Sequence, residues 1–402
     1  MPRTLWVMSE VYYPEDISTG HYLTEIAEGL TSEHVVKVIT GQPKHMSRGV
    51  RALKRETRND VDIYRVWGTT FDKNFFILRL INMLTIGLST LFFAARSFKR
   101  GDRVLAVTAP PTMPLVAMVA ALLRGASVTI LIQDSYPEIL VAVGKIKAKS
   151  WIAWVTNFVN RWVYKHAAKI IVIGRDMRDL FEKKTEGFDV PIEVIPNWAD
   201  LDAIQPESRD ENPLLKELDL ENKFVLLCAG NLGPAIELAT LVDAAKILSS
   251  DAKVHFLFIG AGAKVKWLRA QVDELALSNV TLLDYRPRDE QNIFLNACDI
   301  GVVALIRGMK GTAMPSRTYN LMAAGKPIIA VCESGSELDL VVTEDRSGKV
   351  IAPGHSQELA DTIQKMASSP GTLADYGRNA RAAAETKYSR DKAILLFRQA
   401  MS

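Results

Sequence analysis

The segment between Gly308 and Pro327 concentrates residues that could bind a charged ligand. Its glycines allow a flexible loop, and Pro315 suits the first turn of a helix. Lys310 and Arg317 flank that turn, so two cations and the free N–H groups of the helix could together attract a diphosphate. A surface loop that caps a closely packed helix explains the same residues equally well.

A second glycine pair, Gly260 and Gly262, follows the apolar run Val254–Ile259 and precedes a helical pattern. Dinucleotide-binding turns have this placement but carry a third glycine, which is missing here. We therefore favour ordinary turn chemistry over dinucleotide binding, and a nucleotide near the turn stays open.

Other catalytic chemistries lack a starting residue. The six histidines show no paired metal-ligand spacing. Asp200 and Asp202 open an acidic stretch, so we interpret them as solvated carboxylates. The sequence has no nucleophile elbow, no Gly-Lys-Ser/Thr phosphate loop and no set of kinase motifs. We predict no metal site and no cofactor.

Composition sets the broad class. The 402 residues are 48% hydrophobic and 24% charged, which is typical of a globular chain of two or three domains. Lysine and arginine number 49 against 46 acids, and this net charge of +3 does not favour nucleic-acid binding. Cys228, Cys298 and Cys332 lie far apart in apolar stretches, which predicts buried thiols in a reducing cytosol. The apolar run Leu5–Met8 is too short for a signal peptide.

The elements that must position these loops are short β-branched runs that alternate with helical patterns, as in a parallel α/β sheet. The pattern predicts a Rossmann-like domain over residues 1–200, an acidic linker over 201–222 and a second Rossmann-like domain over 223–387. We expect the last helix, about 388–402, to pack back on the first domain. Two doubly wound sheets have their strand-end crevices free to face each other, so we expect a site in an interdomain cleft. The expected strands are 5–9, 35–40, 104–108, 127–133, 169–173, 192–196, 224–228, 254–260, 280–284, 300–303, 327–331 and 349–351.

Several short motifs, taken in order and spacing, resemble glycosyltransferase family 4. These are retaining enzymes of GT-B architecture, and the likeness is to the branch that builds bacterial envelope polysaccharides. It covers nearly the whole chain. The matching pieces are Tyr13–Glu15 with Gly20, Gln133–Glu138, Val194–Asp200, Ala229–Gly233, Pro315–Arg317, Met322–Pro327 and Tyr376–Arg381.

The resemblance implies that the second domain holds a nucleotide diphosphate sugar, most simply a UDP-sugar, and that the first domain holds an acceptor. It implies that Gly20 approaches the donor phosphates and that Tyr285 and Arg286 contact the base. Retention is usually explained by attack on the face that the leaving group vacates, so the protein chiefly orients substrates and stabilises charge. The resemblance and the loops together give these further donor-binding candidates: Gly230, Asn231, Gly260, Lys310, Gly311, Thr312, Ser316, Arg317, Thr318, Tyr319 and Asn320.

The chain departs from the family pattern at positions that usually carry charge. Thr312 and Asn320 stand where relatives have two glutamates eight positions apart. Asn231 and Ile236 stand where many relatives have arginine and lysine. Neutralisation of the diphosphate must therefore come from other residues.

Two groups are our candidate catalytic residues. Arg317, with Lys310, is the cation expected to stabilise the departing diphosphate. Gln133 occupies the place where some relatives have histidine, which leaves Asp134 as the nearest ionisable group.

Two basic stretches without acids favour contact with an anionic membrane surface. Residues 73–100 carry five bases around an uncharged run of 16 residues, shorter than the roughly 20 needed for a span: Lys73, Arg79, Arg96, Lys99 and Arg100. Residues 145–169 carry six bases, and helical spacing places four aromatic residues on one side: Trp151, Trp154, Phe158 and Trp162. Spacing alone leaves open whether these four lie in the core or form an interfacial anchor.

We therefore expect a glycosyltransferase that is peripheral on the inner face of the cytoplasmic membrane. It would move a hexosyl or N-acetylhexosaminyl group to a lipid-linked precursor of O-antigen, capsule or exopolysaccharide. Three alternatives stay open: the same chemistry on a soluble acceptor, a nucleotide-sugar-binding protein without transfer activity, and a sugar-nucleotide epimerase on a similar scaffold.

Overall fold

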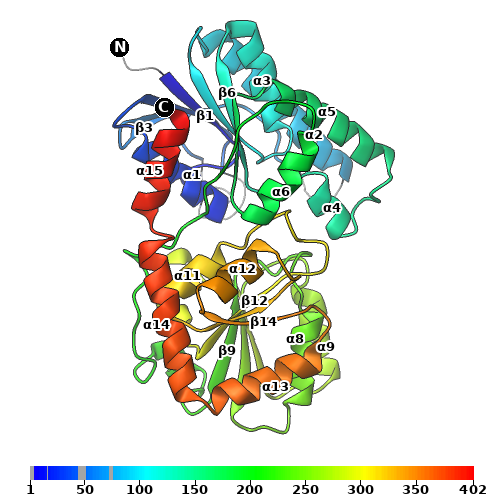
Figure 1. The fold of residues 1–402 in the computed structure, drawn as a ribbon, viewed down its shortest axis with the longest axis vertical. Coiled ribbons are helices and arrows are strands. Elements are labelled where there is room, and N and C mark those ends of the chain that lie inside the picture. Colours follow the sequence, from blue (N-terminus) through cyan, green and yellow to red (C-terminus); the bar gives the residue numbers. More distant parts are fainter. Residues whose placement is uncertain (1–3, 16, 44–50, 72–75) are drawn as a thin grey trace. The chain divides into compact units, whose positions relative to one another are not determined.

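The computed structural model describes residues 4–15, 17–43, 51–71 and 76–402, which form two compact units (Figure 1). The first unit comprises Met1–Pro137, Ile146–Pro196 and Ala393–Ser402. The second comprises Glu138–Lys145 and Asn197–Lys392. Most of the terminal helix α15 (Arg390–Met401) therefore belongs to the first unit.

The first unit contains an eight-stranded sheet in the order β3-β4-β2-β1-β5-β6-β7-β8. Neighbouring strands are parallel, except that β3 and β4 are antiparallel. The central strands are continuous apolar runs because both faces of a parallel sheet are covered. The sequence pattern missed β3 and β4, since β3 is a charged edge strand. The bounds are β1 (Thr4–Met8), β2 (Val35–Thr40), β3 (Arg55–Arg58), β4 (Val61–Arg65), β5 (Arg103–Val107), β6 (Ser127–Ile132), β7 (Lys169–Val172) and β8 (Ile192–Val194).

Helices cover this sheet between the strands. Ser150 caps the helix that follows it, because its hydroxyl accepts a hydrogen bond from the N–H of Ala153 at 3.3 Å. Gly125 ends another helix with a left-handed φ of 71°. The helices of this unit, besides α15, are α1 (Ser18–Gly29), α2 (Phe76–Ser97), α3 (Met113–Arg124), α5 (Trp151–His166) and α6 (Arg175–Lys184).

The second unit contains a six-stranded parallel sheet in the order β11-β10-β9-β12-β13-β14. The strand bounds are β9 (Phe224–Ala229), β10 (Val254–Ile259), β11 (Val280–Leu283), β12 (Ile300–Ala304), β13 (Ile328–Val331) and β14 (Gly348–Ile351). The helix bounds are α4 (Glu138–Ala142), α7 (Pro213–Glu217), α8 (Ala239–Ile247), α9 (Val265–Glu274), α10 (Gln291–Asn296), α11 (Arg317–Ala323), α12 (Glu337–Glu344), α13 (Ser356–Ala367) and α14 (Pro370–Thr386). All twelve strands expected from the sequence are present within one or two residues.

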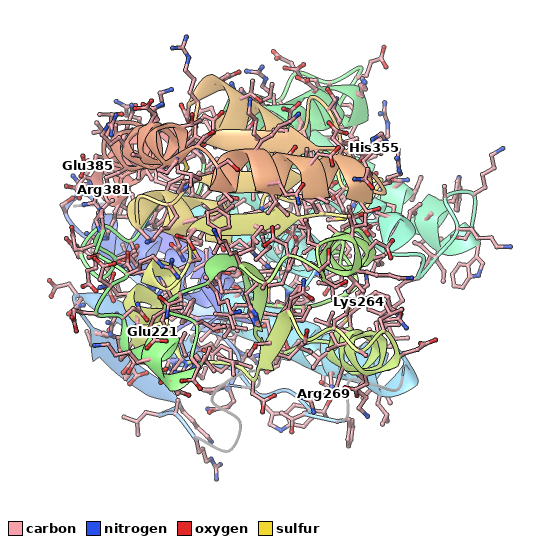
Figure 2. All side chains as sticks on the ribbon, turned by 90° about the horizontal axis from the view of Figure 1, so that it is seen from below. Glu221, Lys264, Arg269, His355, Arg381 and Glu385 are labelled. Atoms are coloured by element: carbon pink, nitrogen blue, oxygen red, sulfur yellow. The ribbon has the colours of Figure 1, made fainter. Side chains whose placement is uncertain are left out.

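The motif Tyr376–Arg381, which lies in α14, packs against the end of α11. A Cβ atom at Gly377 of α14 would overlap the backbone oxygen of Gly325, which follows α11. Arg381, labelled in Figure 2 beside its ion-pair partner Glu385, donates to the carbonyl of Ala323 at 2.6 Å. The same guanidinium donates to the carbonyl of Ile204 at 3.1 Å. The motif therefore fixes the helix that carries Arg317.

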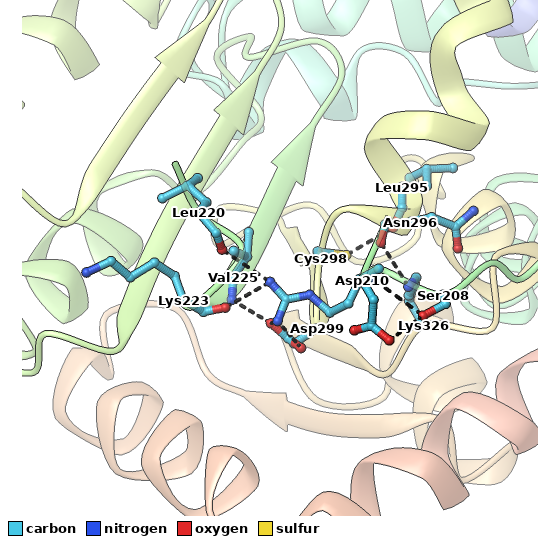
Figure 3. A network of polar contacts seen from close by, with 11 residues as sticks. Ser208, Asp210, Leu220, Lys223, Val225, Leu295, Asn296, Cys298, Asp299 and Lys326 are labelled. Carbon is cyan, nitrogen blue, oxygen red and sulfur yellow. Dashed lines mark hydrogen bonds and ion pairs between the residues drawn. The ribbon is translucent and has the colours of Figure 1, made fainter. Parts of the chain in front are cut away.

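Residues 201–222, which composition suggested as a linker, pack on the second unit. Leu214 and Leu215 of α7 are buried. Arg209 pairs with Asp299 at 3.1 Å, and its Nη2 donates to the carbonyl of Lys223 at 2.8 Å, within the network drawn in Figure 3. These contacts join the segment to the sheet, because Asp299 immediately precedes β12.

Candidate active site

The sheet of the second unit has a topological switch point beside β9. Strand order runs from β9 to β10 on one side and from β9 to β12 on the other. In open α/β sheets, ligands bind in the crevice outside the carboxyl ends of the strands at such a point. The loop after β9 begins with Gly230 and Asn231, and the loop after β12 leads to α11.

Arg317 bridges these two loops. Its Nη2 donates a hydrogen bond to the carbonyl oxygen of Asn231 at 3.0 Å. A Cβ atom at Gly230 would lie 3.4 Å from the Arg317 Cζ, so the glycine leaves room for the guanidinium. Burial lowers the pKa of Arg317, and the adjacent Cys228 thiol opposes this change. A partly buried cation held by one carbonyl favours the approach of an anion.

The polar atoms of α11 that are buried without a hydrogen-bond partner among the described residues include Arg317 Nη1, Thr318 Oγ1 and Asn320 Oδ1. The Cys228 thiol beside the guanidinium is only a weak sulfur acceptor. Buried polar atoms almost always have partners, so these three mark a place for a polar ligand. Arg317 and Asn320 are three residues apart and share one side of the helix.

The glycine pair after β10 is explained by packing of the loops. A Cβ atom at Gly260 would overlap the backbone oxygen of Gly230, and one at Gly262 would overlap the backbone of Leu232. Their φ angles of 151° and 157° also favour glycine. Gly260 therefore lets the β9 and β10 loops meet, which agrees with ordinary turn chemistry.

Lys264 follows this turn and was not among the sequence candidates. Its Nζ donates to the carbonyl of Ile236 at 2.6 Å, and its place on the second unit is labelled in Figure 2. Burial lowers its pKa, and the charge of Glu237 opposes this. Arg317 and Lys264 thus bring cations to Asn231 and Ile236, where the resemblance led us to expect arginine and lysine. In the sequence, the only feature that points to this role of Lys264 is its position directly after a glycine turn.

Lys310 and Arg317 reach different loops. The Lys310 Nζ donates to the carbonyl of Ser334, after β13, at 3.0 Å. Gly311 has a left-handed φ of 73°, which lets the chain turn behind Lys310. The hydroxyl of Thr312 donates to the carbonyl of Met309 at 2.8 Å, so Thr312 stabilises the loop itself.

The other residues expected to contact the donor differ in position and burial. Ser316 directly precedes α11. Tyr319 is fully buried, and its ring centroid lies 5.0 Å from that of Tyr388, so it belongs to the core beneath α11. Tyr285 is exposed after β11, whereas Arg286 is paired with Glu217 and Glu290 at 3.0 Å each. Contact of the last two with a base stays a prediction.

In the first unit, Asp134 lies two residues after β6, the strand that pairs with β5, in a partly buried position. Burial raises the pKa of its carboxyl group to about 6. The hydroxyl of Thr108 accepts hydrogen bonds from the N–H groups of Gln133 and Asp134 at 3.1 and 3.4 Å, which fixes the strand end. Gly20 lies near the start of α1, and a Cβ atom there would lie 2.7 Å from the carbonyl oxygen of Glu15.

The three cysteines are free and buried, as predicted. Within the described residues, no group of three or more histidines, cysteines and acids could hold a metal ion.

Two family models together match most of the chain. One describes glycosyl transferases group 1 and matches residues 211–383, and the other describes a glycosyl transferase 4-like domain and matches residues 19–198. WbjE of Pseudomonas aeruginosa, a protein named as a glycosyltransferase, is 31% identical over 294 residues, covering 71% of this chain and 72% of WbjE. The chain belongs to the glycosyl transferase group 1 family.

A second named relative agrees with this family, and a solved structure shares the fold. WcaI of Escherichia coli (strain K12), named for colanic acid biosynthesis, is 25% identical to the glycosyl transferase over 343 residues, covering 81% of this chain and 83% of WcaI. The crystal structure of Anabaena Alr3699/HepE in complex with UDP-glucose has a TM-score of 0.74 and 17% identity, covering 99% of this chain and 98% of HepE. The family resemblance and the predicted GT-B fold of two parallel-sheet α/β domains are confirmed.

The aromatic residues of α5 in this glycosyl transferase are exposed rather than core. Trp151, Trp154, Phe158 and Trp162 are 74%, 68%, 65% and 38% exposed. The opposite side of α5 is buried through Ala153, Val163 and Tyr164. The alternative that the four aromatic residues lie in the core is therefore wrong.

One helix in the described chain meets the length and composition of a membrane span. It is α2, whose window Leu80–Ser97 is 22% buried. Core helices meet the same test, so this is weak evidence and the expectation of no span stays a prediction. Lys73, which belongs to the basic stretch, lies outside the described residues.

Proposed function

We propose that this glycosyl transferase moves a hexosyl or N-acetylhexosaminyl group from a UDP-sugar to a lipid-linked glycan precursor, with retention of anomeric configuration. The observation that supports it best is the set of buried polar atoms on Arg317, Thr318 and Asn320 that lack a partner among the described residues. A diphosphate and sugar hydroxyls together supply the acceptors and donors that these atoms need.

The charges of the second unit favour a diphosphate. Arg317 and Lys264 are partly desolvated cations, each with one recorded carbonyl partner near the carboxyl end of β9. Desolvated cations interact with an anion more strongly than cations in water do. HepE, which shares the fold, is recorded with UDP-glucose, and this favours UDP as the nucleotide.

The proposed reaction needs orientation and charge stabilisation more than a protein nucleophile. The acceptor hydroxyl oxygen bonds to the anomeric carbon while the bond from that carbon to the diphosphate breaks. The departing UDP takes the acceptor proton, and Arg317 and Lys264 stabilise the charge that develops on it. Asp134 would orient the acceptor from the first unit, as an ionised group above pH 6.

The proposed acceptor and location have separate support. WcaI is named for colanic acid biosynthesis, an envelope polysaccharide, and such glycans favour a lipid-linked acceptor. The exposed tryptophans of α5 and the bases around them favour attachment to the inner face of the cytoplasmic membrane.

Thermal stabilisation by a panel of nucleotides and nucleotide sugars tests the donor, because specific binding raises the melting temperature. UDP and one UDP-sugar should stabilise the protein more than the corresponding guanosine and adenosine compounds. Transfer to polyprenyl-diphosphate-linked sugars in detergent then tests the acceptor, and proton NMR of the product reads its anomeric configuration. Binding without transfer to any acceptor would instead indicate a binding protein, and donor conversion without acceptor would indicate an epimerase.

A further inference from the structure

We propose that α2, α3 and α5 form one docking surface that lies on an anionic lipid bilayer and inserts apolar side chains from all three helices. This extends the proposed function, on which it rests, from one aromatic helix to a layer of three. The sequence indicates membrane contact for the two basic stretches 73–100 and 145–169, but it names inserting side chains only on α5.

The outer side of α2 is an apolar stripe. Leu80, Leu84, Leu88 and Phe92 recur every four residues, and each is between 45% and 66% exposed. The opposite side packs on the sheet, where Ile86 is fully buried against the positions of Gly41 and Gly68. A helix that covers a sheet usually presents charged or polar residues to water. We therefore expect the exposed leucine stripe to contact an apolar environment.

The helix α3 joins this stripe to α5. It packs against α2 on one side and α5 on the other, and the three helices lie together in the first unit (Figure 1). Close packing with α2 is possible because Gly87 faces Val116, whose Cγ2 lies 3.6 Å from a Cβ built at the glycine. Leu122 and Leu123 at the end of α3 are 53% and 68% exposed. The apolar surface is therefore shared by all three helices.

The charge of this surface favours anionic lipid. The sequences of α2, α3 and α5 contain no aspartate or glutamate. Arg96 lies over the ring of Phe92, with its Cζ 3.4 Å from the ring centroid, and exposed lysines at 145, 147 and 149 precede α5. Asp102, close to the end of α2 in sequence, is buried and accepts a hydrogen bond from Trp6 Nε1 at 3.0 Å. Basic residues beside tryptophan and leucine are typical of helices that lie in the lipid interface.

The contacts of α2 favour lying on the membrane over crossing it. The Asn82 side chain accepts from the N–H of Phe71 at 3.0 Å and donates to its carbonyl at 2.9 Å. The hydroxyl of Thr69 donates to the same side chain at 2.8 Å. Crossing a bilayer would break these hydrogen bonds and remove Ile86 from its contact with the sheet. The polar groups left without partners in the hydrocarbon core would cost free energy.

The surface begins beside the expected acceptor site of the first unit. The helices α2 and α5 each lead into a strand, β5 and β7, and run against its direction. The first part of α2, which includes Leu80, and the first residue of α5, Trp151, therefore lie toward the carboxyl edge of the sheet. Asp134 lies at that edge. A lipid-linked acceptor could reach it from the bilayer without its chain leaving the lipid.

Flotation with vesicles tests the surface directly. We expect the wild-type protein to float with vesicles of phosphatidylcholine containing phosphatidylglycerol, and L84S/L88S in α2 and W154S/F158S in α5 to lower the partition coefficient by about tenfold or more each. The matched control is Leu395→Ser in α15, where a leucine is 51% exposed on another helix, and it should float as wild type does. All variants should keep the wild-type melting temperature, because the changed side chains are exposed.

Four results would overturn the proposal. The first is wild-type protein that stays in solution, and the second is an α2 variant that floats as well as wild type. The third is a dimer in sedimentation equilibrium that L84S/L88S dissociates, because a second copy would then cover the stripe. Resistance to alkaline carbonate extraction would indicate that α2 crosses the bilayer and would also contradict it. Stabilisation by UDP-glucose, measured without lipid on the same preparations, reports separately on the proposed function.

Discussion

The Arg317 guanidinium donates a 3.0 Å hydrogen bond to the backbone carbonyl of Asn231, 86 residues earlier in the chain. The β9 loop has an amide side chain at this position, and the charge is supplied by the helix that starts on the other side of the switch point. Lys264 makes the corresponding contact with Ile236 at 2.6 Å. Cations are therefore present in the site although the loop after β9 carries none.

Arg317→Ala should lower turnover by about 10²–10³-fold, because it removes a preorganised donor from the departing diphosphate. Arg317→Lys should recover part of the rate, since it keeps the charge but loses the forked geometry. Steady-state kinetics with the donor identified by thermal stabilisation gives both numbers. Wild-type rates in the alanine variant would exclude a role for Arg317 in charge stabilisation.

Lys264→Gln should weaken binding of the UDP-sugar by about tenfold, because one charge-assisted contact with the diphosphate is lost. Its control is Arg269→Gln in α9, where an exposed guanidinium lies 3.9 Å from Asp284 and has no place in the site. Isothermal calorimetry at two salt concentrations measures the effect. Equal affinities for the two variants would contradict the assignment of Lys264.

Asn320→Ala should weaken donor binding and leave the fold intact, because the Oδ1 atom has no hydrogen-bond partner among the described residues to lose. Asn320→Asp should weaken it further, since a carboxylate would repel the diphosphate. Calorimetry and the melting temperature separate loss of binding from loss of stability. Unchanged affinity in Asn320→Ala would remove the residue from the donor site.

Asp134→Asn should stabilise the protein at pH 7.5 and have little effect near pH 4. Burial raises the pKa from 3.8 to about 6, so the folded state favours the protonated form. The stability that this group contributes is present in full below pH 3.8 and is lost as the pH rises through 6. The stability lost in this way amounts to up to about 3 kcal/mol of unfolding free energy. Denaturation midpoints of both proteins from pH 4 to 8 should diverge with rising pH, and parallel curves would contradict the raised pKa.

Gly377→Ala should destabilise the second unit by about 1–3 kcal/mol, because the added methyl overlaps the backbone oxygen of Gly325 and displaces α11. Gly371→Ala in the same helix α14 is the control, since a Cβ there has no atom within 4 Å. The control should be neutral or more stable by up to about 1 kcal/mol. If thermal unfolding gave equal stabilities, the contact between α14 and the α11 turn would be unimportant.

The sequence by itself determined the alternation of strands and helices, the family and the burial of the three cysteines. These are local properties: Val254–Ile259 is apolar enough to be a central strand wherever it lies, and a motif such as Met322–Pro327 has the same residues before folding as after. It also determined that Trp151, Trp154, Phe158 and Trp162 share one side of a helix. Periodicity shows that these residues share one side, but it does not show whether that side faces the core or a lipid surface, because both environments favour apolar residues.

The tertiary structure decided what depends on distant residues meeting. The exposure of α5 and the stripe on α2 follow from which helix sides the sheet already covers. The acidic composition of residues 201–222 predicts a linker, but Arg209 meets Asp299 only after the sheet of the second unit has formed. In the same way, the chain order places Arg317 far from Asn231 and Lys264 far from Ile236. Only the parallel sheet brings their strand ends together, since it aligns the carboxyl ends of β9, β10 and β12 at one edge.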